Sequence, residues 1–320
     1  MENALIPLNR DGQLAPLGNS VRQYLAASVA ANTQRGYQSD WKQFTAWCDA
    51  TGHASLPAAP VMIARYLAHL ADNGRKASTI DRARAAIRKM HEAAGLEDPT
   101  HALAVTQTLK GIRRTIGTAP QQKAPAVSAD IKAMIAHLPD TRKGQRDKAL
   151  LLVGFAGGFR RSELVGIRAE HVSVTSDGVT ILLPFSKTDQ EGHGRLVGIR
   201  RTAHPETCPV RALLAWLTAA GITCGPVFRS IDKGNHIHPD ALTAQSVALV
   251  VKAAATAAQL DVAKYSGHSL RAGLVTQAAK NKANVTDIMR QTGHQSVETV
   301  NKYIRKANIF EDNVSGMIGL

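Results

Sequence analysis

Hydrophobic residues recur at helical spacing through the first third of the chain, between a polar N-terminal stretch and a proline-containing break. Residues 1–18 are rich in Asn, Gly and Pro, and we expect them to form a disordered tail. Apolar side chains then fall on one face of successive segments, so residues 19–116 are predicted to form an all-helical domain. Residues 117–127 contain two prolines and show no periodicity, which is typical of a linker.

The remaining residues, 128–320, alternate between helical periodicity and short β-branched runs. The helical pattern predicts helices over about 128–138, 143–157, 160–168, 209–220, 241–258, 269–281, 284–292 and 297–306. The β-branched runs predict strands at 171–175, 179–185 and 196–200, with a hairpin turn at Asp177-Gly178. The fold class is therefore mainly α: an all-helical N-terminal domain, followed by a mostly helical α/β domain with a small antiparallel sheet.

Charge suggests the kind of partner that these domains bind. The chain carries a formal net charge of +14, and residues 1–127 (15 Lys and Arg, 9 Asp and Glu) are basic as well as the remainder. Such a balance favours a polyanion, most commonly nucleic acid. An anionic membrane surface competes, but the chain shows no basic amphipathic helix with aromatic anchors, no membrane-spanning apolar run and no N-terminal signal pattern. We therefore expect a cytoplasmic protein.

One predicted helix, which starts near Ser78, concentrates this charge. Between residues 75 and 89 the sequence has six basic residues and one acidic residue. A solvated helix face is the simpler explanation, but the density of charge favours a surface that contacts DNA phosphates. The candidate DNA-binding residues are Arg75, Lys76, Arg82, Arg84, Arg88 and Lys89.

Metal binding is not indicated by the sequence. Cys48, Cys208 and Cys224 are scattered and form no CxxC pair, so reduced thiols are expected rather than disulfides or a zinc site. His236 and His238 are interpreted as loop residues rather than as metal ligands, because no acidic or cysteine ligand is expected to join them. The acidic residues do not form the cluster that a two-metal nuclease uses. We expect no metal and no other cofactor.

Four polar clusters in the second domain contain residue types that could break a phosphodiester. They are Gly158-Phe-Arg-Arg-Ser-Glu163, Ser186-Lys187-Thr188, Gly267-His-Ser-Leu-Arg271, and Gly293-His294 followed by Tyr303. Arginines can grip the charged oxygens of the transition state, histidines can donate further hydrogen bonds, and a lysine can protonate the leaving oxygen. A tyrosine can be the nucleophile if surrounding charges or a base activate it. Together these groups would form a metal-free catalytic set.

In order and spacing, these clusters resemble those of the tyrosine recombinases, also called phage integrases. The resemblance covers about residues 18–310 and extends to the N-terminal half, where Arg35-Gly-Tyr37, Trp41 and Phe44 match the entry helix of the family's core-binding domain. It implies six catalytic residues, with Tyr303 as the nucleophile and Glu163 in a supporting role. The implied catalytic residues are Arg160, Lys187, His268, Arg271, His294 and Tyr303.

The same resemblance implies a site-specific recombinase that clamps a double-stranded DNA site between its two domains. It would cut and rejoin strands through a 3′-phosphotyrosyl intermediate and a four-way junction, without metal or ATP. The resemblance also implies a homo-oligomer, a tetramer on two DNA sites, in which the apolar C-terminal segment 308–320 docks on a neighbouring subunit; docking on its own subunit is the alternative.

Several alternatives remain open at this point. The family pattern selects Arg160 over the adjacent Arg161, and Tyr265 is the rival nucleophile because it lies three residues before His268. A type IB topoisomerase-like enzyme shares the chemistry, and a non-catalytic DNA-binding protein would need only the basic charge. Neither the DNA target nor the choice between integration, excision, resolution and transposition can be read from the residues.

Overall fold

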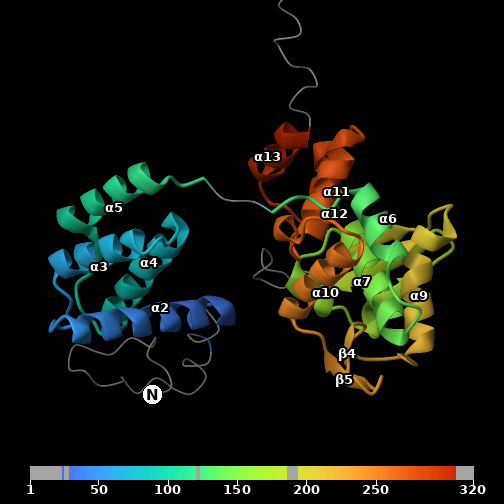
Figure 1. Cartoon of the computed structure of the whole chain (residues 1–320), viewed down its shortest axis with the longest axis horizontal. Coiled ribbons are helices and arrows are strands. Elements are labelled where there is room, and N and C mark those ends of the chain that lie inside the picture. Colours follow the sequence, from blue (N-terminus) through green and yellow to red (C-terminus); the bar gives the residue numbers. More distant parts are fainter. Residues whose placement is uncertain (1–23, 25–28, 120–122, 186–193, 308–320) are drawn as a thin grey trace, which may run out of the picture. The chain divides into compact units, whose positions relative to one another are not determined.

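The computed structural model describes residue 24 and residues 29–119, 123–185 and 194–307. The chain forms two compact units, Met1–Gln121 and Gln122–Leu320 (Figure 1). The predicted fold class is confirmed, since helices dominate both units and the strands form only small antiparallel sheets.

The first unit is entirely helical within its described residues. Its elements are α2 (Ala31–Ala50), α3 (Pro60–Asp72), α4 (Ala77–Ala93), the 3-10 turn η1 (Pro99–His101) and α5 (Leu103–Ile116). Helix α2 packs on α4, and α3 packs on α5. Phe44, Leu67, Ile80, Ile87 and Val105 are completely buried between them, so the apolar stripe predicted by helical spacing forms the core. Each such side chain contributes about 1.5–3 kcal/mol when it leaves water.

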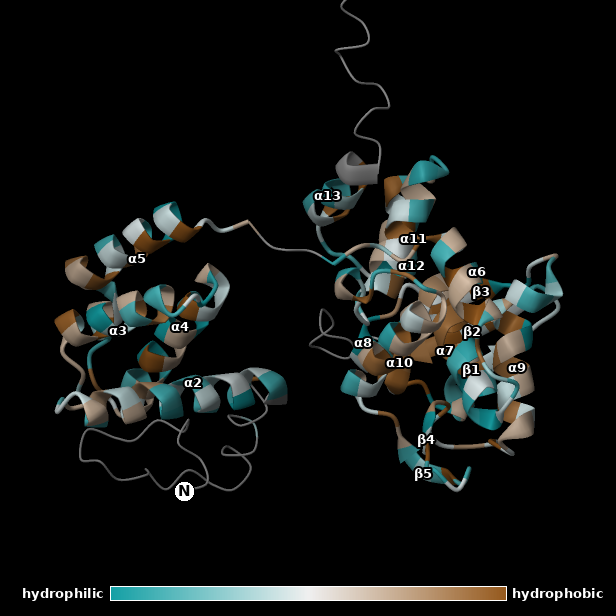
Figure 2. Cartoon of the chain, viewed as in Figure 1, coloured by the Kyte–Doolittle hydropathy of each residue, from teal (hydrophilic) through white to brown (hydrophobic). Residues whose placement is uncertain are grey.

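The second unit surrounds one central apolar helix. Its helices are α6 (Ser128–Ala136), α7 (Arg142–Gly157), α8 (Arg161–Val165), α9 (Pro209–Ala219), α10 (Ala244–Ala257), α11 (Ser269–Lys280), α12 (Val285–Thr292) and α13 (Val297–Ala307), with 3-10 turns η2 (Ala169–His171), η3 (Pro205–Thr207) and η4 (Val262–Lys264). Helix α7 packs against α6, α9, α10, α11 and strand β3 (Arg195–Arg200). In Figure 2 hydrophobic residues are concentrated in α7, as expected for a helix that is covered on several faces.

Strands β1 (Val172–Val174), β2 (Gly178–Leu183) and β3 form an antiparallel sheet in the order β1-β2-β3. Ile181 of β2 pairs with Val172 on one side and Val197 on the other, which places Val197 and Ile181 in the core. The predicted hairpin turn at Asp177-Gly178 lies between β1 and β2, as the sequence indicated.

Three sequence predictions in this unit were wrong in detail. Strands β4 (Arg229–Ile231) and β5 (Ile237–Ala241) form a hairpin that was not predicted, because β5 contains Pro239 and Asp240, which are rare in strands. The helix expected from residue 241 therefore begins only at Ala244. The helix expected over 160–168 is the short α8, which ends at Gly166.

No helix among the described residues is long and apolar enough to cross a membrane. Cys48 and Cys208 are buried and Cys224 is exposed, and all three are free thiols.

Candidate active site

Arg160 is positioned by the turn that joins α7 to α8. Helix α7 ends at Gly157, and the next residue, Gly158, adopts a left-handed conformation (φ 60°, ψ 32°) that lets the chain reverse. Arg160 then caps α8, and its backbone N–H donates to Glu163 Oε2 at 2.8 Å. Its guanidinium makes an ion pair with Glu163 Oε1 at 2.5 Å and reaches the Gly293 carbonyl at 3.5 Å. The Arg160 head group is thus fixed by two segments far apart in the sequence.

Arg271 lies in the first turn of α11 and is only 2% exposed. Its Nη1 donates to the carbonyls of Gly158 at 2.7 Å and Thr292 at 2.5 Å, while Nη2 is buried without a hydrogen-bond partner among the described residues. These carbonyls lie at the C-terminal ends of α7 and α12, where helix dipoles favour a cation. Burial, followed by the nearby charge of Arg160, lowers the pKa of Arg271 to about 10, so this guanidinium stays protonated at neutral pH.

His268 and Tyr303 are brought together by α11 and α13. His268 caps the N-terminus of α11, and Tyr303 lies on α13, where it packs with Val275, Ile288 and Val300. The distance from His268 Nε2 to Tyr303 Oη is 3.1 Å, which is within hydrogen-bonding range. The structure therefore joins a phenol to an imidazole that is 35 residues away in the sequence.

The environment keeps both partners of this pair uncharged near neutral pH. The pKa of His268 is lowered first by burial against neighbouring protein atoms and then by the positive charges of Arg271, Arg161 and Arg160. Part of the His268 residue nevertheless stays exposed. Burial raises the pKa of Tyr303 above its usual value of 10, and Arg271 only partly opposes this. A neutral imidazole can accept a proton, and a neutral phenol can give one.

His294 is placed by a second left-handed glycine. Gly293 (φ 67°, ψ 40°) directly follows α12 and turns the chain so that His294 Nδ1 lies 2.6 Å from Thr292 Oγ1. The His294 ring centroid is 6.4 Å from that of Tyr303. Burial, followed by the charges of Arg271, Arg160, His268 and Arg195, lowers the pKa of His294 to about 4.

Arg195 is a further cation in this cluster that sequence reasoning missed. Arg195 is the first residue of β3. Its Nη1 donates to the Gln291 carbonyl at 2.6 Å, and its Nη2 lies 3.6 Å from Glu163 Oε2. The sequence shows it only as a basic residue at the end of the polar loop before β3, and no local pattern there marks it as part of the site. Burial lowers the pKa of Arg195.

Other predicted residues fall in or around the cluster. Glu163 is buried and contacts both Arg160 and Arg195. Arg161 is exposed, and its side chain packs over Gly267, where an added Cβ would lie 2.4 Å from Arg161 Cδ. Lys187 falls between β2 and β3 but lies outside the described residues, as does the C-terminal segment 308–320.

Tyr265, the rival nucleophile, lies elsewhere. Its side chain is 8% exposed and belongs to the main hydrophobic core of the second unit. Burial raises the pKa of Tyr265, and the nearby carboxylate of Asp130 raises it further. Tyr303 also has a pKa raised by burial, but its hydroxyl lies beside His268 and near Arg271, whereas that of Tyr265 lies near a carboxylate. The surroundings of Tyr303 therefore suit an activated nucleophile better.

The basic residues of α4 have acidic partners that the sequence window did not include. Arg82 makes a bidentate pair with Asp40 of α2 at 2.6 and 3.0 Å. Arg88 pairs with Glu92 at 2.6 Å and lies 3.4 Å from Asp98, and Lys89 lies 3.3 Å from Glu92.

Arg75 and Arg84 make no ion pair with a described residue. Arg75 and Lys76 line a small pocket at the N-terminal end of α4. Arg75 and Arg84, rather than the paired arginines, keep their charge available to an anion.

The two loop histidines have an acidic neighbour, which corrects the expectation from sequence. Asp232 Oδ2 lies 3.2 Å from His236 Nδ1 and 3.4 Å from His238 Nε2. His238 lies in β5 and not in a loop. Even so, no group of three His, Cys, Asp or Glu side chains in the described part of the chain is arranged to hold a metal ion.

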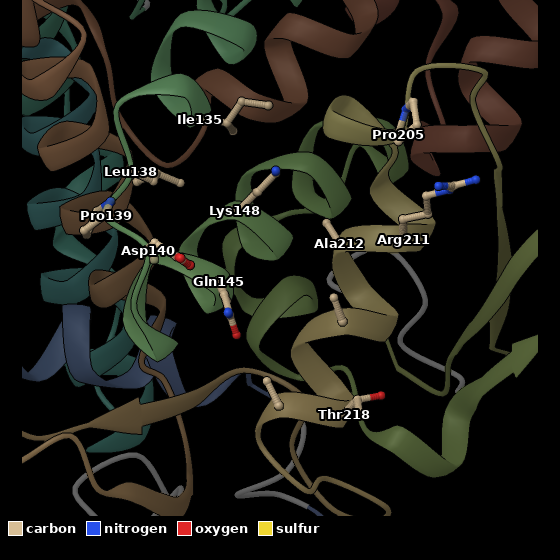
Figure 3. A pocket seen from close by; sticks show the side chains of 13 residues that line it. Ile135, Leu138, Pro139, Asp140, Gln145, Lys148, Pro205, Arg211, Ala212 and Thr218 are labelled. Atoms are coloured by element: carbon tan, nitrogen blue, oxygen red, sulfur yellow. The ribbon is translucent and has the colours of Figure 1, made fainter.

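A pocket of about 680 Å³ is lined by residues of α6, α7 and α9 and of the loops beside them (Figure 3). Its lining, which includes Leu138, Gln145, Lys148, Arg211 and Thr218, contains none of the predicted catalytic residues. Its size does not identify it as the active site, because the chemical groups converge elsewhere.

Comparison with known proteins gives consistent results over both units. A family model described as "Phage integrase family" matches residues 127–308, and one described as "Phage integrase, N-terminal SAM-like domain" matches residues 22–97. An integrase/recombinase XerD homolog of Selenomonas ruminantium is 41% identical over 302 residues, which cover 93% of this chain and 88% of the relative. Tyrosine recombinase XerD of Rhizobium meliloti (strain 1021) is 27% identical, covering 91% of this chain and 89% of the relative.

Solved structures resemble the fold as well. The Tn1549 transposon integrase in complex with transposon right-end DNA matches with a TM-score of 0.61 at 14% identity, over 89% of this chain and 92% of that one. At 14% identity this similarity shows a shared fold only, so the chemistry has to be inferred from the residues of the site.

Proposed function

This chain belongs to the phage integrase family and is a tyrosine-type site-specific DNA recombinase, and we propose that Tyr303 is its nucleophile. The observation that carries the proposal is the 3.1 Å contact between Tyr303 Oη and His268 Nε2, inside a cluster of arginines. The topoisomerase and non-catalytic alternatives are not favoured, since the relatives described above are recombinases and integrases.

In the proposed reaction, Tyr303 Oη attacks the scissile phosphorus as its proton passes to His268 Nε2. The phosphorus–5′-oxygen bond breaks, leaving a 3′-phosphotyrosyl link and a free 5′-hydroxyl. The hydroxyl of a partner strand then attacks this link and releases the tyrosine. The broken bond is replaced by another of the same kind, so ATP is not needed.

The charge that develops on the non-bridging oxygens requires fixed donors. Arg271 supports this role because its Nη2 has no partner among the described residues, while two backbone carbonyls hold Nη1 in place. Arg160 and His294 are proposed to bind the same phosphate, and Arg195 adds to the positive potential. Glu163 is proposed to orient Arg160 rather than to react.

Lys187 is proposed to protonate the leaving 5′-oxygen. This assignment rests on its match to the family lysine between β2 and β3. We propose that the catalytic side chains named above supply the charge and the proton transfers without a metal or another cofactor. Cleavage should therefore persist in EDTA, whereas complete loss in EDTA with recovery on adding Mg²⁺ would contradict the mechanism.

DNA contacts outside the active site are proposed for α4. We propose that Arg75 and Lys76, at the N-terminal end of α4, contact phosphates, since the N-terminal end of a helix attracts anions. Arg84, which makes no ion pair with a described residue, is proposed to contact a phosphate as well. Arg82, Arg88 and Lys89 are proposed to contribute less, because Asp40, Glu92 and Asp98 already share their charge. We also propose a cytoplasmic location, because the substrate is DNA.

The working form is proposed to be a tetramer on two DNA sites, with segment 308–320 docked on the neighbouring subunit. A head-to-tail contact of this kind closes into a ring. Ending the chain after Lys306 should then leave half-site binding nearly normal and abolish cooperative assembly and recombination. Full recombination by the truncated chain would contradict docking on a neighbour, and unfolding would indicate docking on the same subunit.

The nucleophile assignment is tested with matched variants on a nicked DNA that traps the covalent intermediate. Tyr303→Phe should bind DNA normally and form no adduct, because only the phenolic oxygen is removed. Tyr265→Phe, the control, removes the same atom from the core and should still form the adduct. The opposite result would assign the reaction to Tyr265.

A further inference from the structure

Thr292 contacts both a proposed phosphate-binding arginine and a proposed phosphate-binding histidine. It is the last residue of α12 and is completely buried. Its carbonyl accepts from Arg271 Nη1 at 2.5 Å. Its hydroxyl oxygen lies 2.6 Å from the Ile288 carbonyl and 2.6 Å from His294 Nδ1.

The positions of these three atoms restrict where the hydrogens can be. A hydroxyl has one hydrogen to donate and can accept others. The Ile288 carbonyl can only accept, so the Thr292 hydrogen is directed at it. If that hydrogen instead pointed at Nδ1, two acceptor oxygens would face each other at 2.6 Å with no hydrogen between them. The arrangement with both bonds satisfied therefore has the proton on His294 Nδ1.

We propose that Thr292 is a positioning residue whose hydroxyl holds His294 as the Nδ1–H tautomer and leaves Nε2 for the DNA phosphate. The proposal rests on the assignment of His294 to the phosphate-binding group. His294 Nε2 makes no hydrogen bond to a described residue, so it is the ring nitrogen available to a substrate. The low pKa of His294, about 4, means that the free protein holds this ring neutral, and only a neutral ring has a choice of tautomer.

This tautomer determines which atom of His294 exchanges protons. In the neutral ring, Nε2 has a lone pair and accepts hydrogen bonds. A proton taken up from solvent near the negative phosphate adds to Nε2, so the ring then donates from Nε2 while Nδ1 still donates to Thr292. Fixing the second nitrogen in this way is a common means of setting the orientation and tautomer of a functional histidine.

The threonine methyl has a separate packing role. An added Cβ at Gly158 would lie 2.9 Å from Thr292 Cγ2, so the methyl lies against the turn that precedes Arg160. Valine at this position would keep that shape and the carbonyl to Arg271 but lose the hydroxyl. Serine would keep the hydroxyl and lose the methyl. These two variants separate the hydrogen bond from the packing.

The tautomer can be read directly in the full-length protein without DNA. Histidine-specific ¹⁵N labelling and long-range ¹H–¹⁵N correlation spectra at pH 8 distinguish a protonated from an unprotonated ring nitrogen. The His294 signals are those missing from His294→Gln. The proposal predicts protonated Nδ1 in the wild type and in Thr292→Ser, and loss of that preference in Thr292→Val. Protonation of Nε2 in the wild type would overturn it, whatever the identity of the nucleophile.

Kinetics then test whether the tautomer matters for the reaction. At saturating DNA, Thr292→Val should slow single-turnover cleavage about 10–100-fold, the scale typical of losing a residue that orients a functional histidine. Thr292→Ser should recover most of the rate. Thr276→Val, a buried threonine of α11 whose hydroxyl has no partner among the described residues, is the matched control. Equal rates in wild type and Thr292→Val, or an equal loss in Thr276→Val, would overturn the proposal.

Discussion

Two groups of basic side chains in this chain look alike in sequence and differ in how the fold holds them. On α4, carboxylates bind Arg82, Arg88 and Lys89, so much of the positive charge is neutralised within the protein. In the active-site cluster, backbone carbonyls accept hydrogen bonds from both Arg271 and Arg195. A carbonyl dipole orients a guanidinium without cancelling its charge.

This difference separates a structural use of arginine from a chemical one. Exposed ion pairs, such as those of Arg88 and Lys89 with Glu92, contribute about 0–1 kcal/mol of stability and are screened by salt. Buried cations without full neutralisation are costly to fold, as the lowered pKa values of Arg271 and Arg195 indicate. Glu163, paired with Arg160 and Arg195, offsets part of that cost. The remaining positive charge is available to a phosphate.

The largest expected effect distinguishes the two groups directly. Arg271→Ala should lower the single-turnover cleavage rate by about 10²–10³-fold or more, the scale of losing one transition-state donor. Arg82→Ala, the control on α4, should leave the rate of the bound complex unchanged, because Arg82 pairs with Asp40 and is not one of the active-site residues. Comparable losses of cleavage rate in both variants would show that the comparison is wrong.

Within the active site, the adjacent arginines should also differ. Arg160→Ala should cost about 3 kcal/mol of transition-state stabilisation, or roughly 10²-fold in cleavage rate. Arg161→Ala should mainly weaken DNA binding, because its exposed side chain packs over Gly267. The two are compared at saturating DNA, and an equally severe loss in Arg161→Ala would reverse the assignment.

The pH dependence should reflect the neutral His268. Its pKa is lowered from 6.5, so the neutral, proton-accepting form persists below that value in the free enzyme. Accordingly kcat/KM for cleavage should stay level from pH 8 down to about 6.5, and at lower pH fall up to about tenfold per unit as His268 gains a proton. An acid limb centred above 6.5, or one unchanged in His268→Gln, would exclude His268 as the base.

The smallest expected effect concerns binding by α4. Arg84→Ala should weaken binding to all DNA sequences and reduce the slope of log K against log salt by about 0.9, the value for one lost phosphate contact. Arg82→Ala should change that slope less, because Asp40 already pairs with it. Salt titration of DNA binding measures both slopes. A larger change in slope for Arg82→Ala than for Arg84→Ala would contradict the prediction.

The order of the helices and the main sheet could be read from the sequence because their periodicity is strong. Strand β5 could not, because Pro239 and Asp240 are poor strand formers and the pairing with β4 stabilises them. Tertiary pairing also explains why part of the charge on α4 is neutralised, since Asp40 lies 42 residues from Arg82. A count of charges within a short window does not include such a partner.

The candidate site shows the same limit. Motif order indicated Arg160, His268, Arg271, His294 and Tyr303, and the structure brings them into one cluster. Arg195 and Thr292 were missed because their roles depend on contacts with the Gln291 carbonyl and His294 Nδ1. No local pattern in the sequence specifies those contacts.

The identity of the DNA-linked residue tests the central claim most directly. Tyr303 directly follows Lys302, and Tyr265 directly follows Lys264, so trypsin releases the two tyrosines on separate peptides. The covalent adduct is trapped on nicked DNA and digested with trypsin and nuclease, and the nucleotide-bearing peptide is sequenced by mass spectrometry. We predict that the nucleotide is attached to Tyr303. Attachment to Tyr265, or to any residue other than Tyr303, would contradict the account.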